Sequence, residues 1–173
     1  MNLLRRLGEI KNFVFDMDGV LTDGRLIVQE ENIWVRQMNI RDGYAMQLAV
    51  KCGYRIIVIS GSHSSEVSQR LKKLGIDDVL MGVNNKKQVM IDLIAKYKID
   101  IKELLYMGDD LPDYEAMQMA GIACCPADAV VDIKRISCYV SSRRGGDGCV
   151  RDVVEKVLRL NDDWPLHTDI SSI

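Results

Sequence analysis

The segment NFVFDMDGVLTDG (12–24) places three aspartates, Asp16, Asp18 and Asp23, directly after a short apolar run. Carboxylates this close together repel one another, so something in the folded protein must offset the repulsion. A divalent cation with oxygen ligands would do so. This segment is therefore the first place in the chain where residue types and their spacing indicate chemistry.

Other polar side chains follow later apolar runs in the same way. In a parallel α/β sheet, ligands bind at the carboxyl ends of the strands. Because those ends meet at one edge of the sheet, we expect the residues that follow each strand to lie close together. They are Ser60, Gly61 and Ser62 after RIIVI, Lys86 after DDVLMG, and Asp109, Asp110 and Asp113 after ELLYMG.

This set of residues suits the transfer of a phosphoryl group. Mg²⁺ takes carboxylate oxygens and keeps water molecules that a phosphate can replace. Asp16 could act as a carboxylate nucleophile, and Asp18 could protonate the leaving oxygen and later activate water. Ser60 and Lys86 would hold the phosphoryl oxygens by hydrogen bonding and by charge.

Each of these residues taken alone also has a purely structural interpretation. Ser60 could cap a helix, and Lys86 could lie on the surface. Asp109 and Asp110 could begin a helix, where acidic residues are favourable. A calcium loop is excluded because Val20 stands at a ligand position and no glutamate closes the loop. The order in which all these residues follow predicted strands favours a common site.

The hydrophobic pattern alternates between short apolar runs and helical segments. Continuous apolar runs are typical of strands buried on both faces, as in a parallel sheet covered by helices. We therefore predict a doubly wound, Rossmann-like α/β fold. The predicted strands are 12–16, 55–60, 77–82, 103–108, 121–125 and 137–140, and the predicted helices are 43–52, 64–74, 86–98, 112–120 and 149–160.

One segment breaks the alternation directly after the aspartates. It reads as two strands around a polar turn, and we predict a β-hairpin flap at 25–38 that could cover the site. Its apolar residues would leave an exposed edge strand prone to association unless another chain pairs with it. The hairpin therefore favours an oligomer. The rest of the 173-residue chain is expected to form one domain, 1–160, followed by a tail at 161–173.

Composition excludes several classes of partner. A net charge of −2 argues against a nucleic-acid binder that neutralises many phosphates. No apolar run approaches the ~20 residues of a membrane span, and the N-terminal apolar stretch is too short for a signal peptide. Five cysteines without C-x-x-C spacing indicate reduced thiols rather than a disulfide framework. We expect a cytoplasmic protein with no nucleic-acid or membrane partner.

Four motifs, DMDGVLTDG, VISGS, NNK and MGDDLPD, resemble those of the haloacid dehalogenase superfamily of phosphatases. The resemblance covers almost the whole chain and implies a Mg²⁺-dependent phosphatase that forms a phosphoaspartate. It implies that Asp16 is the nucleophile and a Mg²⁺ ligand. Asp18 would be the general acid/base and would bind Mg²⁺ through its backbone carbonyl, and Asp109 would be the third ligand. The remaining implied roles are support of the metal site by Asp110 and Asp113 and phosphate binding by Ser60, Gly61 and Lys86.

The large cap domain of many relatives is missing, and the chain resembles the capless subfamily of 3-deoxy-D-manno-octulosonate 8-phosphate phosphatases. MNIRDGYAMQ (38–47) and RRGGDGCVRDV (143–153) are similar to two further stretches of that subfamily. The resemblance implies hydrolysis of this eight-carbon sugar-acid phosphate for lipopolysaccharide synthesis, by a homotetramer whose active sites are completed by neighbouring subunits. The implied substrate-binding residues are Asn39, Ile40, Arg41, Asp42, Gly43, Gln47 and Arg70.

One difference from the residue pattern of this subfamily leaves a second substrate as an alternative. The subfamily usually carries an arginine after the second strand, where this chain has Ser62, and His63 or Arg70 could compensate. Related phosphatases act on nine-carbon keto-deoxy sugar acids, KDN 9-phosphate or N-acetylneuraminate 9-phosphate. A signalling receiver domain is disfavoured because Asp18 would have no purpose there. A catalytically inactive regulatory module is disfavoured because the acidic residues and the lysine are all present.

Overall fold

The computed structural model describes residues 2–32 and 34–164 of the chain. The predicted tail is therefore described only as far as Trp164, and 165–173 lie outside the described residues. Trp164 packs edge-on against Tyr44 of helix α2 (Ile40–Lys51), with ring centroids 6.1 Å apart. The start of the tail is thus docked on the domain.

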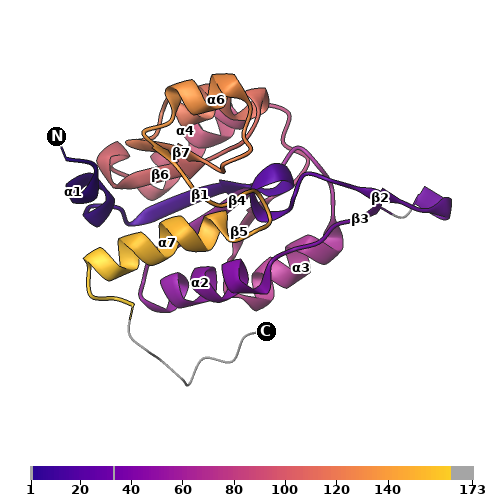
Figure 1. Cartoon of the computed structure of the whole chain (residues 1–173), viewed down its shortest axis with the longest axis horizontal. Coiled ribbons are helices and arrows are strands. Elements are labelled where there is room, and N and C mark those ends of the chain that lie inside the picture. Colours follow the sequence, from indigo (N-terminus) through magenta and orange to yellow (C-terminus); the bar gives the residue numbers. More distant parts are fainter. Residues whose placement is uncertain (1, 33, 165–173) are drawn as a thin grey trace.

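A six-stranded parallel sheet forms the centre of the molecule, in the order β5–β4–β1–β6–β7–β8 (Figure 1). This confirms the predicted doubly wound fold. The chain adds strands outward from β1 in one direction and then returns to add β6 and its neighbours in the other. The strands are β1 (Asn12–Asp16), β4 (Arg55–Ile59), β5 (Asp78–Leu80), β6 (Leu104–Met107), β7 (Ile122–Cys125) and β8 (Tyr139–Val140).

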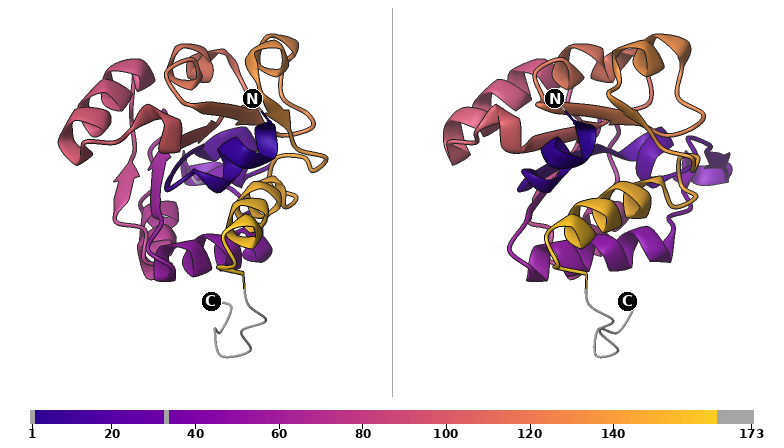
Figure 2. Two further views of the ribbon diagram at one scale, coloured as in Figure 1. Left: turned by 90° about the vertical axis from the view of Figure 1, so that its left-hand side faces the viewer. Right: turned by 60° about the vertical axis from the view of Figure 1, so that its left-hand side comes forward.

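Helices cover both faces of the sheet (Figure 2). Alternate residues of β1 point to opposite faces, so Phe13 and Phe15 pack in one core and Val14 packs in the other. The first core is covered by α1 (Leu3–Gly8), α2, α3 (Ser65–Lys73) and α7 (Cys149–Leu160), and the second by α4 (Lys86–Tyr97), α5 (Tyr114–Met117) and α6 (Val131–Ile136).

The helices differ from the prediction in three places. The hydrophobic pattern does not predict α1 or α6, because each spans only six residues and buries one side chain, Leu7 or Ile133. The predicted helix at 112–120 is instead a 3₁₀ turn, Leu111–Asp113, followed by the four-residue α5. Among the described helices, none combines the length and the apolar character of a membrane-spanning segment.

The hairpin predicted after the first strand is present and projects away from the body of the molecule (Figure 1). It pairs β2 (Ile27–Val28) with β3 (Trp34–Val35) around a 3₁₀ turn at Glu30–Asn32. The side chains of both strands are exposed. Because two strands alone are marginally stable in water, this hairpin needs contacts beyond its own pairing.

The loop before α7 packs directly on the aspartate segment. Gly146 donates its backbone N–H to the carbonyl of Val20 at 3.0 Å. Gly145 lies so close to Gly19 that a Cβ at position 145 would overlap the Gly19 carbonyl. The glycines of RRGGDG therefore permit this close approach, and they connect the last helix to the segment that carries the aspartates.

Gly145→Ala should lower the free energy of unfolding by about 1–3 kcal/mol, because the added methyl group forces the two loops apart. Gly8→Ala is the matched control, since a Cβ there would meet nothing closer than Leu160 Cβ at 3.9 Å. Urea unfolding of both variants measures the difference. Equal stability of the two variants would contradict the close packing of the loops.

Candidate active site

The carboxyl edge of the sheet brings together residues from separate strand ends. Asp16 is the last residue of β1, and Asp109 follows β6, the neighbour of β1 in the sheet. Lys86 is the first residue of α4, which Asn85 caps by accepting the backbone N–H of Gln88 at 2.9 Å. The direction of strand addition reverses between β1 and β6, and such a reversal is where open α/β sheets bind ligands.

Lys86 is buried between two carboxylates. Its Nζ donates to Asp16 Oδ1 at 2.5 Å and to Asp113 Oδ1 at 2.7 Å. All three residues are 1% to 7% exposed, and the hydroxyl of Tyr106 also donates to Asp113 Oδ1, at 2.8 Å. Burial lowers the pKa of Lys86, but the charges of Asp16 and Asp113 outweigh it and leave the pKa above its ordinary value. Lys86 is therefore a charged, buried lysine.

A third carboxylate, Asp109, forms an acidic cluster with Asp16 and Asp113. One oxygen of each lies within 4.8 Å of the other two. Burial, followed by the charge of Asp113, raises the pKa of Asp16 to about 6. Burial, followed by the charges of Asp16 and Asp113, raises the pKa of Asp109 to about 8. The cluster thus holds more negative charge than one lysine balances.

The acidic cluster suits a hard divalent cation such as Mg²⁺. Its donors are carboxylate oxygens, and a cation would relieve the repulsion that raises the two pKa values. Both oxygens of Asp113 already accept hydrogen bonds, from Lys86, Tyr106 and the backbone N–H of Asp109. Asp16 and Asp109 are therefore the side chains that could hold the ion, with Asp113 beside them.

The carboxylate of Asp18 has a different set of partners. Arg36 donates from Nε to Oδ1 at 2.7 Å and from Nη2 to Oδ2 at 3.3 Å. The hydroxyl of Ser62 donates to Oδ2 at 2.7 Å. Nothing in the sequence spacing predicts Arg36 at this position, because only the folding of the hairpin carries it back to the aspartates.

The loop after β4 carries the predicted phosphate-binding residues. Ser60 is 1% exposed, and its Oγ accepts the backbone N–H of Ser62 at 3.0 Å. Gly61 is exposed between them. The ring of His63 packs against Gly82, where a Cβ would overlap it. His63 thus packs on the loop after β5 and is not among the described groups that donate to Asp18.

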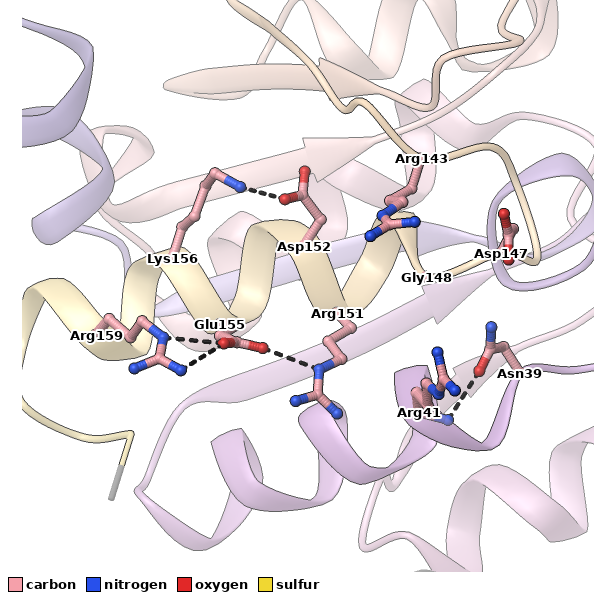
Figure 3. Close-up of a pocket in the computed structure, with 10 residues that line it drawn as sticks. All are labelled: Asn39, Arg41, Arg143, Asp147, Gly148, Arg151, Asp152, Glu155, Lys156 and Arg159. Carbon is pink, nitrogen blue, oxygen red and sulfur yellow. Dashed lines mark hydrogen bonds and ion pairs between the residues drawn. The ribbon is translucent and has the colours of Figure 1, made fainter. Parts of the chain in front are cut away.

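The predicted substrate-binding residues near the start of α2 fall into two groups, one at the surface and one buried. Asn39 and Arg41 line a cavity of about 550 Å³ together with residues of α7 and the loop before it (Figure 3). Ile40 is 60% exposed. These three residues are thus at the surface, but Asp16 and Lys86 do not line the same cavity.

Asp42, Gly43 and Gln47 are instead buried. Asp42 Oδ1 accepts the backbone N–H of Arg151 at 2.7 Å, so Asp42 caps α7, whose own N-cap residue Gly148 has no side chain. Burial raises the pKa of Asp42 to about 6. Its 1% exposure leaves no surface for the predicted substrate contact, and its role here is to join α2 to α7.

Two further predicted site residues lie outside the acidic cluster. Arg70, on α3, lines a separate cavity of about 240 Å³ with Glu66 and Lys73. Asp110 is exposed and caps the following turn by accepting the backbone N–H of Leu111 at 2.7 Å. Its charge helps to raise the pKa of Asp109, but it supplies no oxygen to the cluster.

Comparison with known proteins now identifies the family. Residues 80–151 match the model of the haloacid dehalogenase-like hydrolases. The chain is 31% identical over 157 residues to 3-deoxy-D-manno-octulosonate 8-phosphate phosphatase KdsC of Escherichia coli K12, and the match covers 91% of this chain and 84% of that protein.

Solved structures agree with the sequence match. The 3-deoxy-D-manno-octulosonate 8-phosphate phosphatase of Moraxella catarrhalis, in complex with magnesium, phosphate and KDO, has a TM-score of 0.87 and 31% identity, covering 91% of this chain and 90% of that chain. The enzyme of the same name from Yersinia pestis has a TM-score of 0.90 and 27% identity, covering 93% and 87%. The chain therefore belongs to the haloacid dehalogenase-like hydrolases and, within them, to the family of 3-deoxy-D-manno-octulosonate 8-phosphate phosphatases.

The affinity for Mg²⁺ should rise as the pH rises from about 6 to about 8, by up to about tenfold per pH unit for each displaced proton. The folded protein holds protons on Asp16 and Asp109 that a bound cation must displace, because both pKa values are raised. Without the cation, the folded state binds more protons than the unfolded state, so these two groups make stability fall from about pH 4 to about pH 8. Calorimetric titration with MgCl₂ and thermal unfolding across this range measure both effects. A pH-independent affinity would contradict the crowding of the acidic cluster.

Proposed function

We propose that this protein is a Mg²⁺-dependent phosphatase that hydrolyses 3-deoxy-D-manno-octulosonate 8-phosphate to the free sugar acid and phosphate. The reaction would serve lipopolysaccharide precursor synthesis. The observation that carries the proposal is the buried pair of Lys86 and Asp16 beside an acidic cluster. It occurs in a chain that is 31% identical to a phosphatase solved with magnesium, phosphate and the sugar acid.

Asp16 is the nucleophile in this proposal. Its carboxylate oxygen bonds to phosphorus while the bond from phosphorus to the sugar oxygen breaks. Asp18 gives a proton to the leaving oxygen and then removes one from the water that hydrolyses the phosphoaspartate. Lys86 stays charged beside the nucleophile and neutralises negative charge on the transferred oxygens. Ser60 and Gly61, after β4, complete the phosphate-binding site.

The acidic residues hold Mg²⁺ close to the nucleophile. The bound ion supplies positive charge for the phosphate oxygens as they approach Asp16. Asp109 is kept beside this carboxylate by its backbone hydrogen bond to Asp113, at 3.3 Å. The proposed ligands are Asp16, Asp109 and the backbone carbonyl of Asp18, with Asp110 and Asp113 in support.

The assignment of the eight-carbon substrate rests on the similarity to the relatives. Half-buried Asn39 and exposed Ile40 and Arg41 are the proposed contacts to the sugar acid, and buried Asp42, Gly43 and Gln47 position them from inside α2. Arg70 lies next to Gly43 and is a further candidate. A nine-carbon keto-deoxy sugar acid phosphate is the second candidate substrate, because Ser62 replaces the arginine that the family resemblance leads us to expect.

Phosphate release in the presence of Mg²⁺ tests the proposed function, with the eight-carbon and nine-carbon substrates compared as kcat/KM. We expect a preference of at least about tenfold for the eight-carbon acid.

Asp16→Asn should lower kcat by about 10³-fold or more, because the nucleophile is lost. Asp92→Asn, which changes an exposed aspartate on α4, is the matched control and should keep full activity. A preference for the nine-carbon acid would overturn the substrate, and full activity of Asp16→Asn would overturn the nucleophile.

The proposal includes a cytoplasmic homotetramer in which neighbouring subunits cover each other's active sites. Among residues 2–32 and 34–164, the hairpin is all that stands where a cap domain would follow β1, so a neighbour would have to exclude water from the site. Five free cysteines support a reducing compartment. The exposed apolar side chains that support pairing between hairpins are Leu26, Ile27, Val28, Trp34 and Val35, at 37% to 69% exposure.

Val28→Lys should dissociate this assembly, because a lysine charge cannot be buried without a partner at an apolar interface. Val131→Lys on α6 is the matched control: Val131 is 62% exposed, against 69% for Val28, and the change should leave the assembly intact. Sedimentation equilibrium distinguishes the 19.6 kDa monomer from an assembly of four chains. A tetramer that survives Val28→Lys unchanged would contradict pairing through the hairpin.

A further inference from the structure

The side chain of Arg36 is buried although the residue lies at the base of an exposed hairpin. Its side chain is 5% exposed, against 30% for the Asp18 side chain with which it pairs. Its two N–H groups reach both oxygens of that carboxylate, at 2.7 Å and 3.3 Å. A guanidinium that donates to both oxygens fixes the plane of the carboxylate as well as its position.

Three segments of the chain converge on this one carboxylate. Arg36 comes from the hairpin, Ser62 comes from the loop after β4, and the Thr22 hydroxyl donates to Oδ1 from the aspartate segment at 3.4 Å. None of the three contacts Lys86 or the acidic cluster through a hydrogen bond that the structure shows. The orientation of Asp18 is therefore set separately from that of the nucleophile.

We propose that Arg36 is a positioning residue, which aims the carboxyl group of Asp18 at the leaving oxygen of the substrate. This inference rests on the proposed function. In that reaction an oxygen of Asp16 bonds to phosphorus, the bond from phosphorus to the sugar oxygen breaks, and the proton of Asp18 goes to that oxygen. Protonation of Asp18 on Oδ2 gives up the longer contact to Arg36 Nη2, but Oδ1 still accepts from Arg36 Nε, and this hydrogen bond continues to hold the plane of the carboxyl group.

The contact between Arg36 and Asp18 also gives the hairpin a function within its own subunit. Arg36 directly follows β3, so the path of the hairpin decides whether the guanidinium reaches Asp18. A hairpin held by a neighbouring subunit would fix Arg36 and, through it, the proton donor. In this proposal one element both takes part in the assembly and positions Asp18 within its own subunit.

The dependence of activity on the leaving group tests the role of Arg36. An alkyl sugar oxygen leaves poorly without a proton, whereas p-nitrophenolate leaves readily without one. For Arg36→Met, kcat/KM with the sugar-acid phosphate should fall by about 10²-fold or more, which is the usual size of a general-acid contribution. With p-nitrophenyl phosphate it should change by less than about threefold, and aryl phosphates with more basic leaving groups should give intermediate losses. Arg36→Lys should recover part of the loss, since one N–H donor is restored.

The controls separate this role from a structural one. Arg25→Met changes an exposed arginine on the same hairpin and should leave both activities unchanged. Ser62→Ala removes a second donor to Asp18 and should repeat the leaving-group pattern more weakly, which keeps the test open if Arg36→Met does not fold.

Equal losses on all substrates, or no loss, would overturn the role of Arg36. If the wild-type enzyme cleaves aryl phosphates but not the sugar-acid phosphate, the proposed substrate fails, and the aryl series still tests Arg36. If it cleaves neither, the proposed function fails and this inference fails with it.

Discussion

A lysine ammonium buried between two carboxylates is the interaction on which the rest of the site depends. A buried charge is tolerated only where charged partners and hydrogen bonds replace water, and Lys86 has Asp16 and Asp113. These three residues come from α4, β1 and the turn after β6, so no local segment can build the cluster. The parallel sheet is what brings their positions to one edge, and the cluster forms only when the sheet has formed.

The acidic residues of the site divide into two groups with different cationic partners. Asp16 belongs to the acidic cluster that suits Mg²⁺ and accepts a hydrogen bond from Lys86. Asp18, two residues later, pairs with Arg36 instead. Gly19 adopts a φ of 98° at this point, and a Cβ there would overlap the Asp109 carboxylate. The tight segment thus lets two aspartates face different surroundings. This division matches the two chemical tasks, attack on phosphorus and transfer of a proton.

Sequence reasoning could place Asp16, Lys86 and Asp109 at one edge because strand ends of a parallel sheet meet there whatever the loops do. The strands themselves could be predicted because burial on both faces leaves continuous apolar runs. Arg36 could not be predicted, since its contact depends on how an exposed hairpin folds back. The capping role of Asp42 depends on the packing of α2 against α7, and such contacts between helices leave no periodic pattern in the sequence.

The central chemical step of the proposed reaction is the transfer of the phosphoryl group to Asp16 during turnover. The most direct measurement is to trap that species in Asp18→Asn, in which hydrolysis of the phosphoaspartate should be slowed, with p-nitrophenyl phosphate as substrate. Acid quenching and borohydride reduction convert a phosphorylated aspartate to homoserine, and peptide mapping then locates the change. We expect it at position 16 alone. Modification of a different carboxylate, or release of p-nitrophenol with no modified residue, would contradict the account.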